Sequence, residues 1–290
     1  MSISRRQILQ MLGAGLAVSH VPGVYAASRN PASTLKPPRL QAGDMVGMVN
    51  PAGATFHPED VVIARESLAA LGLKMKAGEH LLDRYGYLAG SDQDRAADVN
   101  SMFADRKVKA ILTLRGGWGC NRLLQLLDYP LIAKNPKILM GYSDITSLLL
   151  ALNAKTGLVT FHGPVGISSW NKYSTGYVEK LLFNAEAFSM ENPTEIGDHL
   201  AQVKDRVLTI NGGKAKGKLL GGHLSVLTAM VGSDYLPDFK DNILFLEEDG
   251  EDIYRIDRML TQLRLAGVLG RLSGFVFGKC SNCGPGKTYG

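Results

Sequence analysis

Short apolar runs alternate with helix-type segments between residues 45 and 163, and this alternation limits the possible folds more than any other feature. The runs at 45–49, 73–77, 108–114, 137–140 and 159–161 predict short buried strands. The segments between them carry helix-start residues and apolar residues at helical spacing. Strands that alternate with helices predict a parallel sheet covered on both faces. Ligands of such sheets bind beyond the carboxyl ends of the strands.

A second α/β segment follows a stretch without clear periodicity. Glycines after residue 206 lead to a predicted helix start at His223. A strand at 242–246, an amphipathic helix that starts at Ile253 and a strand at 275–277 complete the pattern. We therefore expect an N-terminal α/β domain at 40–165, a connector at 166–205 and a smaller α/β domain at 206–290.

The excess of positive charge belongs to the first 40 residues. Five of the 32 Lys and Arg residues lie there without any acidic residue, and the remaining 27 equal the 27 Asp and Glu residues. Because basic and acidic side chains are equal in number after residue 40, the charge of the folded part gives no support for nucleic-acid binding. A twin-arginine pattern at 4–9, an apolar run at 11–18 and small residues at 24–26 predict a signal peptide at 1–26. We accordingly expect a linker at 27–39 and a periplasmic protein. The alternative to a signal peptide is an amphipathic N-terminal helix.

A Gly-Tyr-Ser-Asp turn at 141–144 joins an apolar strand to a helix. A serine at such a turn stands clear of the sheet, and backbone N–H groups at the helix start can stabilise an oxyanion. Ser143 is therefore a candidate nucleophile. The alternative is an ordinary helix cap by Ser143 or Asp144, and Ile145 stands where the general nucleophile-elbow pattern has a second glycine.

Two further segments can complete a nucleophilic site. The glycines of the loop at 115–119 would let bare backbone approach a ligand, although a plain tight turn is the alternative. Glu247 directly follows a predicted strand and could orient an imidazole, although acidic clusters there usually complement the start of a helix. His162 and His223 lie near glycines by the expected crevice, but structural roles are the commoner case for each.

The three cysteines do not indicate a metal site. Cys280 and Cys283 form one C-x-x-C pair among glycines, without the second Cys/His pair that zinc requires and without a helix that starts at the motif. We expect structural cysteines, with a disulfide between the two as a hypothesis for an oxidising compartment. We expect neither a metal nor a cofactor.

Three motifs in order closely resemble the LD-carboxypeptidases of serine peptidase family S66. They are Arg-Gly-Gly-Trp-Gly at 115–119, Gly-Tyr-Ser-Asp at 141–144, and Leu-Glu with Tyr-Arg-Ile-Asp-Arg at 246–258. The resemblance covers the chain from about residue 40 onward. It implies a Rossmann-like N-terminal domain of the class I glutamine-amidotransferase-like type, a smaller C-terminal domain, and an active site between them.

The resemblance also assigns roles to residues. It implies Ser143 as the nucleophile and Glu247 as the acid of a Ser–Glu–His triad. It implies an oxyanion hole made by the backbone N–H groups of Asp144 and Gly117. Trp118 and His223 are expected in the substrate cleft. No metal is required.

The chain departs from the family pattern in two ways, and each departure leads to a separate expectation. The family's histidine lies in a Gly-His segment well beyond the Glu-containing strand, and no histidine follows Glu247 here. We therefore expect a truncated C-terminal domain and an inactive 290-residue chain. The second departure is the export signal, because the better-known members recycle murein in the cytosol.

The implied reaction is hydrolysis of the L,D-peptide bond before the terminal D-alanine of a murein tetrapeptide. Cleavage of aminoacyl-nucleotide antibiotics, as in microcin-immunity relatives, and non-catalytic muropeptide binding are the alternatives. The expected partner is a murein peptide, with neither nucleic acid nor, after signal cleavage, a membrane. A homodimer is left open.

Overall fold

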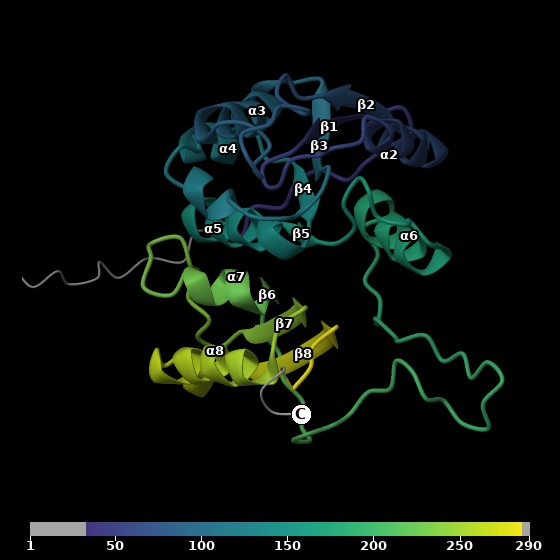
Figure 1. The fold of residues 1–290 in the computed structure, drawn as a ribbon, viewed down its shortest axis with the longest axis vertical. Coiled ribbons are helices and arrows are strands. Elements are labelled where there is room, and N and C mark those ends of the chain that lie inside the picture. Colours follow the sequence, from purple (N-terminus) through teal and green to yellow (C-terminus); the bar gives the residue numbers. More distant parts are fainter. Residues whose placement is uncertain (1–32, 286–290) are drawn as a thin grey trace, which may run out of the picture. The chain divides into compact units, whose positions relative to one another are not determined.

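The fold is described for residues 33–285 in a computed structural model (Figure 1). The predicted signal peptide and residues 27–32 of the predicted linker lie outside the described residues. Among the helices that are described, none is long and apolar enough to cross a membrane.

Five parallel strands form the main sheet, as the alternating pattern predicts. Their order is β2-β1-β3-β4-β5, and every neighbouring pair is parallel. The strands are β1 (Met45–Val49), β2 (Lys74–Ala77), β3 (Val108–Thr113), β4 (Ile138–Gly141) and β5 (Phe161–His162). The α/β class with a parallel sheet is thus confirmed.

Helices connect these strands and cover the sheet (Figure 1). They are α2 (Glu59–Ala70), α3 (Asp92–Ala104), α4 (Tyr129–Lys134) and α5 (Thr146–Thr156). Ser91 with Asp94 three residues later predicts a helix start, and the cap is present: the Ser91 side chain accepts a hydrogen bond from the Asp94 N–H. The leucine spacing at 123–127 predicts a helix, and that prediction is wrong: a short 3₁₀ turn stands at Cys120–Leu123, although Leu123, Leu124 and Leu127 are all buried.

The expected connector is helical in its first half. Helix α6 (Lys172–Val178) continues into a π-helical turn at Glu179–Phe183. Val178 and Leu182 lie one turn apart and are both buried in an apolar cluster that also contains residues of the main sheet. This spacing of buried residues is the helical periodicity of the segment. Residues 187–216 contain no helix or strand.

A second, smaller parallel sheet has the order β6-β7-β8. Its strands are β6 (Leu219–His223), β7 (Ile243–Asp249) and β8 (Gly274–Ser281), with helices α7 (Leu224–Ala229) and α8 (Ile253–Leu265). The glycines of β6 concealed this strand from the sequence pattern. Strand β7 is also longer than predicted, so Glu247 lies within the strand and not after it.

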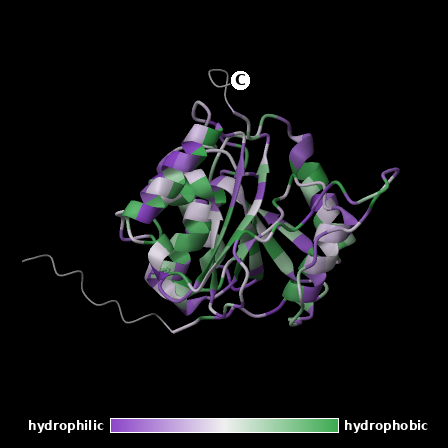
Figure 2. Cartoon of the chain, turned by 90° about the horizontal axis from the view of Figure 1, so that it is seen from below, coloured by the Kyte–Doolittle hydropathy of each residue, from purple (hydrophilic) through white to green (hydrophobic). Residues whose placement is uncertain are grey.

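One buried apolar cluster joins the two sheets. It includes Leu148 and Leu152 of α5, Leu224 and Leu227 of α7, and Leu246 of β7. Figure 2 shows hydrophobic residues concentrated on the inner sides of the helices and along the strands. Because α5 starts at the Gly-Tyr-Ser-Asp turn, this packing brings the second sheet next to Ser143.

Candidate active site

Ser143 occupies a strained turn between β4 and α5. Its φ angle is +61°, in the left-handed region that non-glycine residues seldom adopt. A 3₁₀ turn at Ser143–Ile145 follows at once and leads into α5. The Ser143 side chain makes no hydrogen bond to any other described residue. This strained strand-to-helix turn is the local geometry of a nucleophile elbow.

Gly141 makes this turn possible. A Cβ at position 141 would lie 2.4 Å from Thr113 Oγ1 and 2.9 Å from Ile145 Cγ2. The strand therefore ends in a residue without a side chain, and the Ile145 side chain packs in the space that Gly141 leaves open. The departure at Ile145 thus does not disrupt the turn.

The glycine loop after β3 lies directly against Ser143. A Cβ on Gly116 would be 3.0 Å from Ser143 Cβ and 3.2 Å from Ser143 Oγ. Gly116 is therefore the glycine that lets the loop approach Ser143, a role that the sequence did not separate from that of Gly117. Gly117 has a φ angle of +131° and packs on the backbone of Gly53. Its N–H has no backbone partner among the described residues and remains the expected oxyanion donor.

Asp144 fixes the start of the elbow helix to the same loop. Its buried carboxylate accepts a hydrogen bond of 2.8 Å from the Cys120 N–H. Burial raises the pKa of the Asp144 carboxyl. The side chain is thus structural, while the Asp144 backbone N–H belongs to the first turn, where N–H groups lack helical partners.

Glu247 faces His162 across the boundary between the sheets. Glu247 Oε1 lies 3.6 Å from His162 Nε2. This oxygen is buried and has no hydrogen-bond partner among the described residues. Burial raises the pKa of the Glu247 carboxyl and lowers that of His162 to about 4. The His162 ring contacts the rings of Tyr142 and Phe245, at centroid distances of 6.3 and 5.5 Å.

Glu248 is a buried partner of His223 that the sequence analysis missed. Glu248 Oε1 lies 3.1 Å from His223 Nδ1, and only 1% of its side chain is exposed. Burial alone would lower the pKa of His223, but the hydrogen bond and negative charge of Glu248 outweigh it and raise the pKa. The alternation of β7 could have revealed Glu248, because Leu244, Leu246 and Glu248 share the buried face while Glu247 lies on the other.

The His223–Glu248 pair holds the second sheet to the elbow helix. The His223 backbone N–H donates to Oγ1 of Thr146, the first residue of α5, at 3.0 Å. Glu248 also accepts the Ser225 N–H at 2.8 Å. Ser225 Oγ lies 3.2 Å from His223 Nδ1, the nitrogen that also faces Glu248. A catalytic triad needs the serine and the carboxylate on different nitrogens of the imidazole. Because the Ser225 hydroxyl and the Glu248 carboxylate both lie at Nδ1 of His223, these three side chains do not form a second triad.

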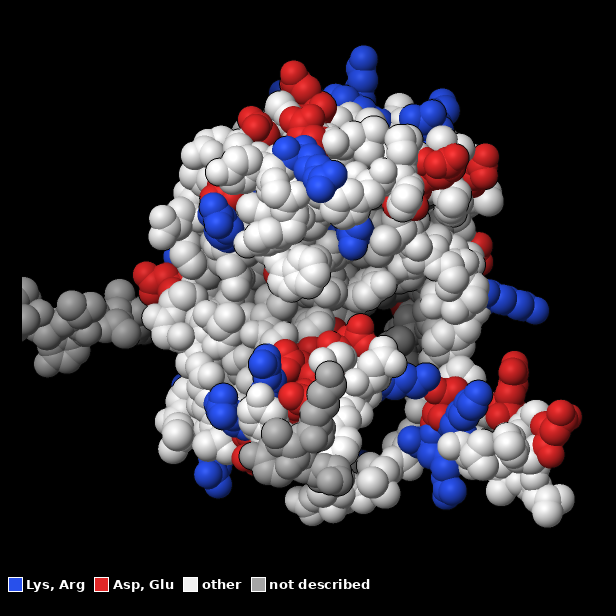
Figure 3. Space-filling model, viewed as in Figure 1, with Lys and Arg blue, Asp and Glu red and all other residues white. Residues whose placement is uncertain are grey.

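Trp118 lies on the surface near the rim of the glycine loop. The residue is 66% exposed, and its ring meets that of Tyr87 edge-on at 6.2 Å. An exposed aromatic ring beside Gly117 is consistent with the expected place in a substrate cleft. Figure 3 shows that acidic side chains gather in the middle of the face drawn, beside a hollow in the surface, while Lys and Arg are scattered.

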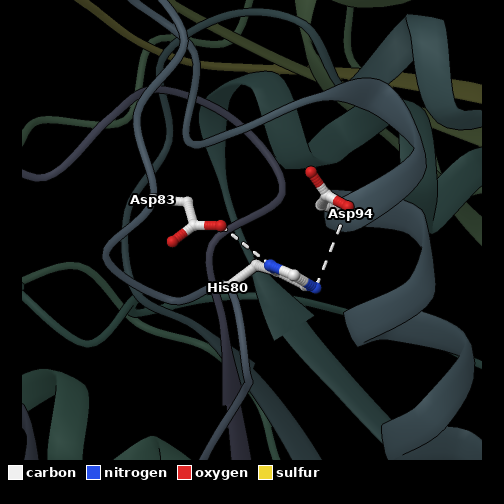
Figure 4. A group of neighbouring side chains, drawn as sticks. All are labelled: His80, Asp83 and Asp94. Atoms are coloured by element: carbon white, nitrogen blue, oxygen red, sulfur yellow. Dashed lines mark hydrogen bonds and ion pairs between the residues drawn. The ribbon is translucent and has the colours of Figure 1, made fainter.

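A separate group of three side chains has the composition of a metal site. His80, Asp83 and Asp94 place one ligand-type atom each within 4.8 Å of the others (Figure 4). Asp83 meets His80 Nδ1 at 2.8 Å, while Asp94 lies 3.9 Å from Nε2 on the other side of the ring. One ion can bind only one of these nitrogens. The hydrogen bond that His80 donates to Asp83, together with the nearby carboxylates, raises the pKa of His80, which favours an imidazolium between two carboxylates.

The C-x-x-C pair forms a disulfide. Cys280 and Cys283 are bonded at the end of β8, and Cys120 is buried as a free thiol. The Gly250 N–H donates to the Ser281 carbonyl at 2.8 Å, so the disulfide loop is attached to the end of β7. Its position at a strand end supports the structural role and not a redox motif at a helix start.

A parallel α/β fold, a serine on a strained strand-to-helix turn and a glycine loop against that serine are typical of hydrolases with a serine nucleophile. Comparison with known families identifies the class more closely. Residues 46–163 match the LD-carboxypeptidase N-terminal domain, and residues 216–290 match the LD-carboxypeptidase C-terminal domain. The chain belongs to this family, the S66 peptidases.

Individual relatives agree with this assignment. A probable murein peptide carboxypeptidase of Bacillus subtilis is 38% identical over 257 residues, which cover 87% of this chain and 77% of the relative. The microcin C7 self-immunity protein MccF of Escherichia coli is 31% identical, with 83% and 76% covered. The crystal structure of a muramoyltetrapeptide carboxypeptidase from Oxalobacter formigenes matches with a TM-score of 0.69 at 27% identity, with 82% and 77% covered.

Proposed function

We propose that this chain is a serine carboxypeptidase that hydrolyses the L,D-peptide bond before the terminal D-alanine of murein tetrapeptides. Family membership supports the serine-type carboxypeptidase, and the relatives' names support the murein peptide. The single observation that carries the proposal is the strained position of Ser143 against Gly116. That arrangement presents a hydroxyl beside free backbone N–H groups, which acyl transfer requires.

Ser143 Oγ attacks the carbonyl carbon of the diamino acid and gives its proton to a base. The N–H groups of Gly117 and Asp144 stabilise the oxyanion of the tetrahedral intermediate. Collapse breaks the C–N bond, and D-alanine leaves after its amine takes up the proton. Water then attacks the ester, gives a proton to the same base, and releases the shortened peptide and Ser143.

Glu247 is the acid that orients the imidazole of this base. Its unsatisfied buried oxygen supports that role, since a carboxylate in such a position accepts an N–H. Neither nearby histidine is assembled as the base, because no described histidine hydrogen-bonds to Ser143. His162, with a pKa of about 4, is also a weak proton acceptor at neutral pH.

Mass spectrometry of products tests the proposal. The 290-residue chain and a version of it extended through the family's Gly-His segment are each incubated with murein tetrapeptide and, separately, with an aminoacyl-nucleotide conjugate; turnover is expected of the extended version. Loss of one alanine from the tetrapeptide, absent in Ser143→Ala, supports the proposal. Cleavage of the conjugate alone would assign the microcin-immunity activity. Binding of tetrapeptide to a protein that cleaves neither compound would assign a muropeptide-binding role.

We also propose export by the twin-arginine route, on the basis of the sequence pattern at 4–9 alone. A reporter fused to residues 1–40 should reach the periplasm, and replacement of both Arg5 and Arg6 by Lys should retain it in the cytoplasm. Export through the general secretory route in the double variant would contradict this assignment.

A further inference from the structure

The pairing between β7 and β8 shifts its register at Glu247. Leu246 pairs with Phe277, but Glu248, two residues later, pairs with Cys280, which is three residues later on β8. Strand β8 therefore carries one extra residue opposite Glu247, which is the arrangement of a β-bulge. Bulges are common next to active sites, where they redirect a side chain. The direction of the Glu247 side chain thus depends on how β8 is held at this point.

The two bulge residues of β8 contact different parts of the chain. A Cβ on Gly278 would lie 3.4 Å from Glu247 Cβ and 3.2 Å from the Phe245 ring, so β8 packs directly on Glu247 here. Lys279 is mostly exposed and forms an ion pair of 2.5 Å with Asp205 of the connector. Exposed ion pairs contribute little to stability. The ion pair is therefore a weak restraint on the bulge.

The disulfide supplies a stronger restraint directly after the bulge. No residue of β8 is fully buried, and the register of a strand is weakly specified where burial does not fix one face. Cys280 is the first paired residue after the bulge, and its bond to Cys283 closes a loop of four residues. A covalent link over so short a loop limits the conformations of the chain independently of packing. The disulfide thus keeps Cys280 in register opposite Glu248.

The disulfide loop also holds the chain that follows Glu247. The Asn282 side-chain amide donates to Asp249 Oδ1 at 2.8 Å. The Ile253 N–H, at the start of α8, donates to the Gly284 carbonyl at 2.9 Å. Glu247 is therefore fixed by the bulge beside it and by these bonds to the segment after it, and the disulfide loop is common to both.

We propose that the Cys280–Cys283 disulfide positions Glu247, so that the enzyme reaches its full rate only when these two cysteines are oxidised. The proposal rests on the proposed function, in which Glu247 orients the catalytic imidazole. A dithiol reductant gives two electrons and two protons to the disulfide, which becomes two thiols, and is itself oxidised to a disulfide. The opened loop then no longer fixes the register of β8, and Glu247 loses its direction. The cysteines act through Glu247 and are positioning residues.

Histidine titration by NMR tests the proposal without any hydrolysis. The ionisable groups around His162 are Glu247, His223 and Tyr142. Burial lowers the pKa of His162 to about 4 in the oxidised chain. Displacement of Glu247 would admit water to this boundary between the sheets. Reduction with dithiothreitol should therefore raise the pKa of His162 toward its ordinary value of 6.5.

Two variants serve as controls for this titration. Cys280→Ser combined with Cys283→Ser should give the same pKa shift as reduction and no further response to dithiothreitol, which excludes an effect through the free thiol of Cys120. Ser281→Ala alters the same loop but keeps the disulfide, so the pKa of His162 should not change. An unchanged pKa in the reduced protein, or an equal shift in Ser281→Ala, would overturn the proposal.

Steady-state kinetics of the chain extended through the family's Gly-His segment provide the second test. Reduction should lower kcat roughly 10- to 100-fold with little change in KM, because a displacement of about 1 Å can cost about 100-fold in rate. Reoxidation should restore kcat. A disulfide that only stabilises the fold would lower Tm and leave kcat unchanged, which would overturn the proposal. If no version hydrolyses murein tetrapeptide, the proposed function is refuted, whereas the titration of His162 still decides whether the disulfide positions Glu247.

Discussion

His162 Nε2 and Glu247 Oε1 lie 3.6 Å apart, although one residue ends the main sheet and the other belongs to the second sheet. The distance is longer than a hydrogen bond. The pair is nonetheless an ionisable contact between the two sheets, and Glu247 Oε1 has no hydrogen-bond donor among the described residues. Glu248, the next residue, pairs with His223 instead. Two adjacent carboxylates thus have opposite environments.

These environments predict opposite stability changes for Glu247→Gln and Glu248→Gln. The pKa of Glu247 is raised on folding, so its ionisation costs stability as the pH rises through that pKa. Glu247→Gln should therefore raise Tm at pH 8 and have no effect on Tm at pH 3. The pKa of Glu248 is lowered, so its contribution is present above the unfolded pKa and lost as the pH falls through the folded pKa.

Glu248→Gln should accordingly lower stability by about 1–3 kcal/mol at pH 7, because the buried imidazole loses its charged partner. Differential scanning calorimetry of both variants between pH 3 and pH 8 measures these effects. Equal Tm shifts in the two variants would show that the environments do not differ. In the active enzyme, Glu247→Gln should also lower kcat by several orders of magnitude, as loss of a triad acid does.

The left-handed backbone conformation of Ser143 should lower the free energy of unfolding. In the left-handed region, a Cβ costs roughly 1–2 kcal/mol per residue relative to glycine. Ser143→Gly should therefore be more stable than Ser143→Ala by about 1 kcal/mol, and both variants should lack hydrolytic activity. Urea unfolding measures the difference. Ser67→Gly, in the last turn of α2, is the control and should destabilise, since glycine weakens helices.

Gly116→Ala should impair the reaction more than the fold. The added methyl group would lie 3.0 Å from Ser143 Cβ, so the nucleophile must shift. A displacement of about 1 Å in a reacting group can cost about 100-fold in rate. Steady-state kinetics should show the loss in kcat with little change in Tm. Gly212→Ala, which meets no atom within 4 Å, is the matched control. An unchanged kcat in Gly116→Ala would show that this loop does not contribute to the active site.

The disulfide predicts the thiol count of the purified protein. Unfolded without reductant, the chain should expose one reactive thiol, that of Cys120, and after reduction it should expose three. Titration with a thiol reagent in denaturant makes the measurement. Three thiols before reduction, in protein isolated from an oxidising compartment, would mean that Cys280 and Cys283 remain reduced.

Much of the fold could be predicted because its evidence is local. Strand β3 is a continuous apolar run, and Ser91 with Asp94 marks the start of α3 by side-chain chemistry alone. Strand β6 escaped prediction because two of its residues are glycine, which carries no side-chain periodicity. The helical segment at 172–183 escaped because it is short and only Val178 and Leu182 are buried.

The sequence by itself determined the parallel α/β class, the turn that carries Ser143 and the glycine loop that approaches it. These features follow from hydrophobic periodicity and backbone sterics over a few residues. Only the tertiary structure decided that Glu247 faces His162, that Glu248 pairs with His223, and that Gly116 is the glycine against Ser143. Those pairings depend on which strand ends two separate sheets place side by side, and packing of α5 against the second sheet brings them together.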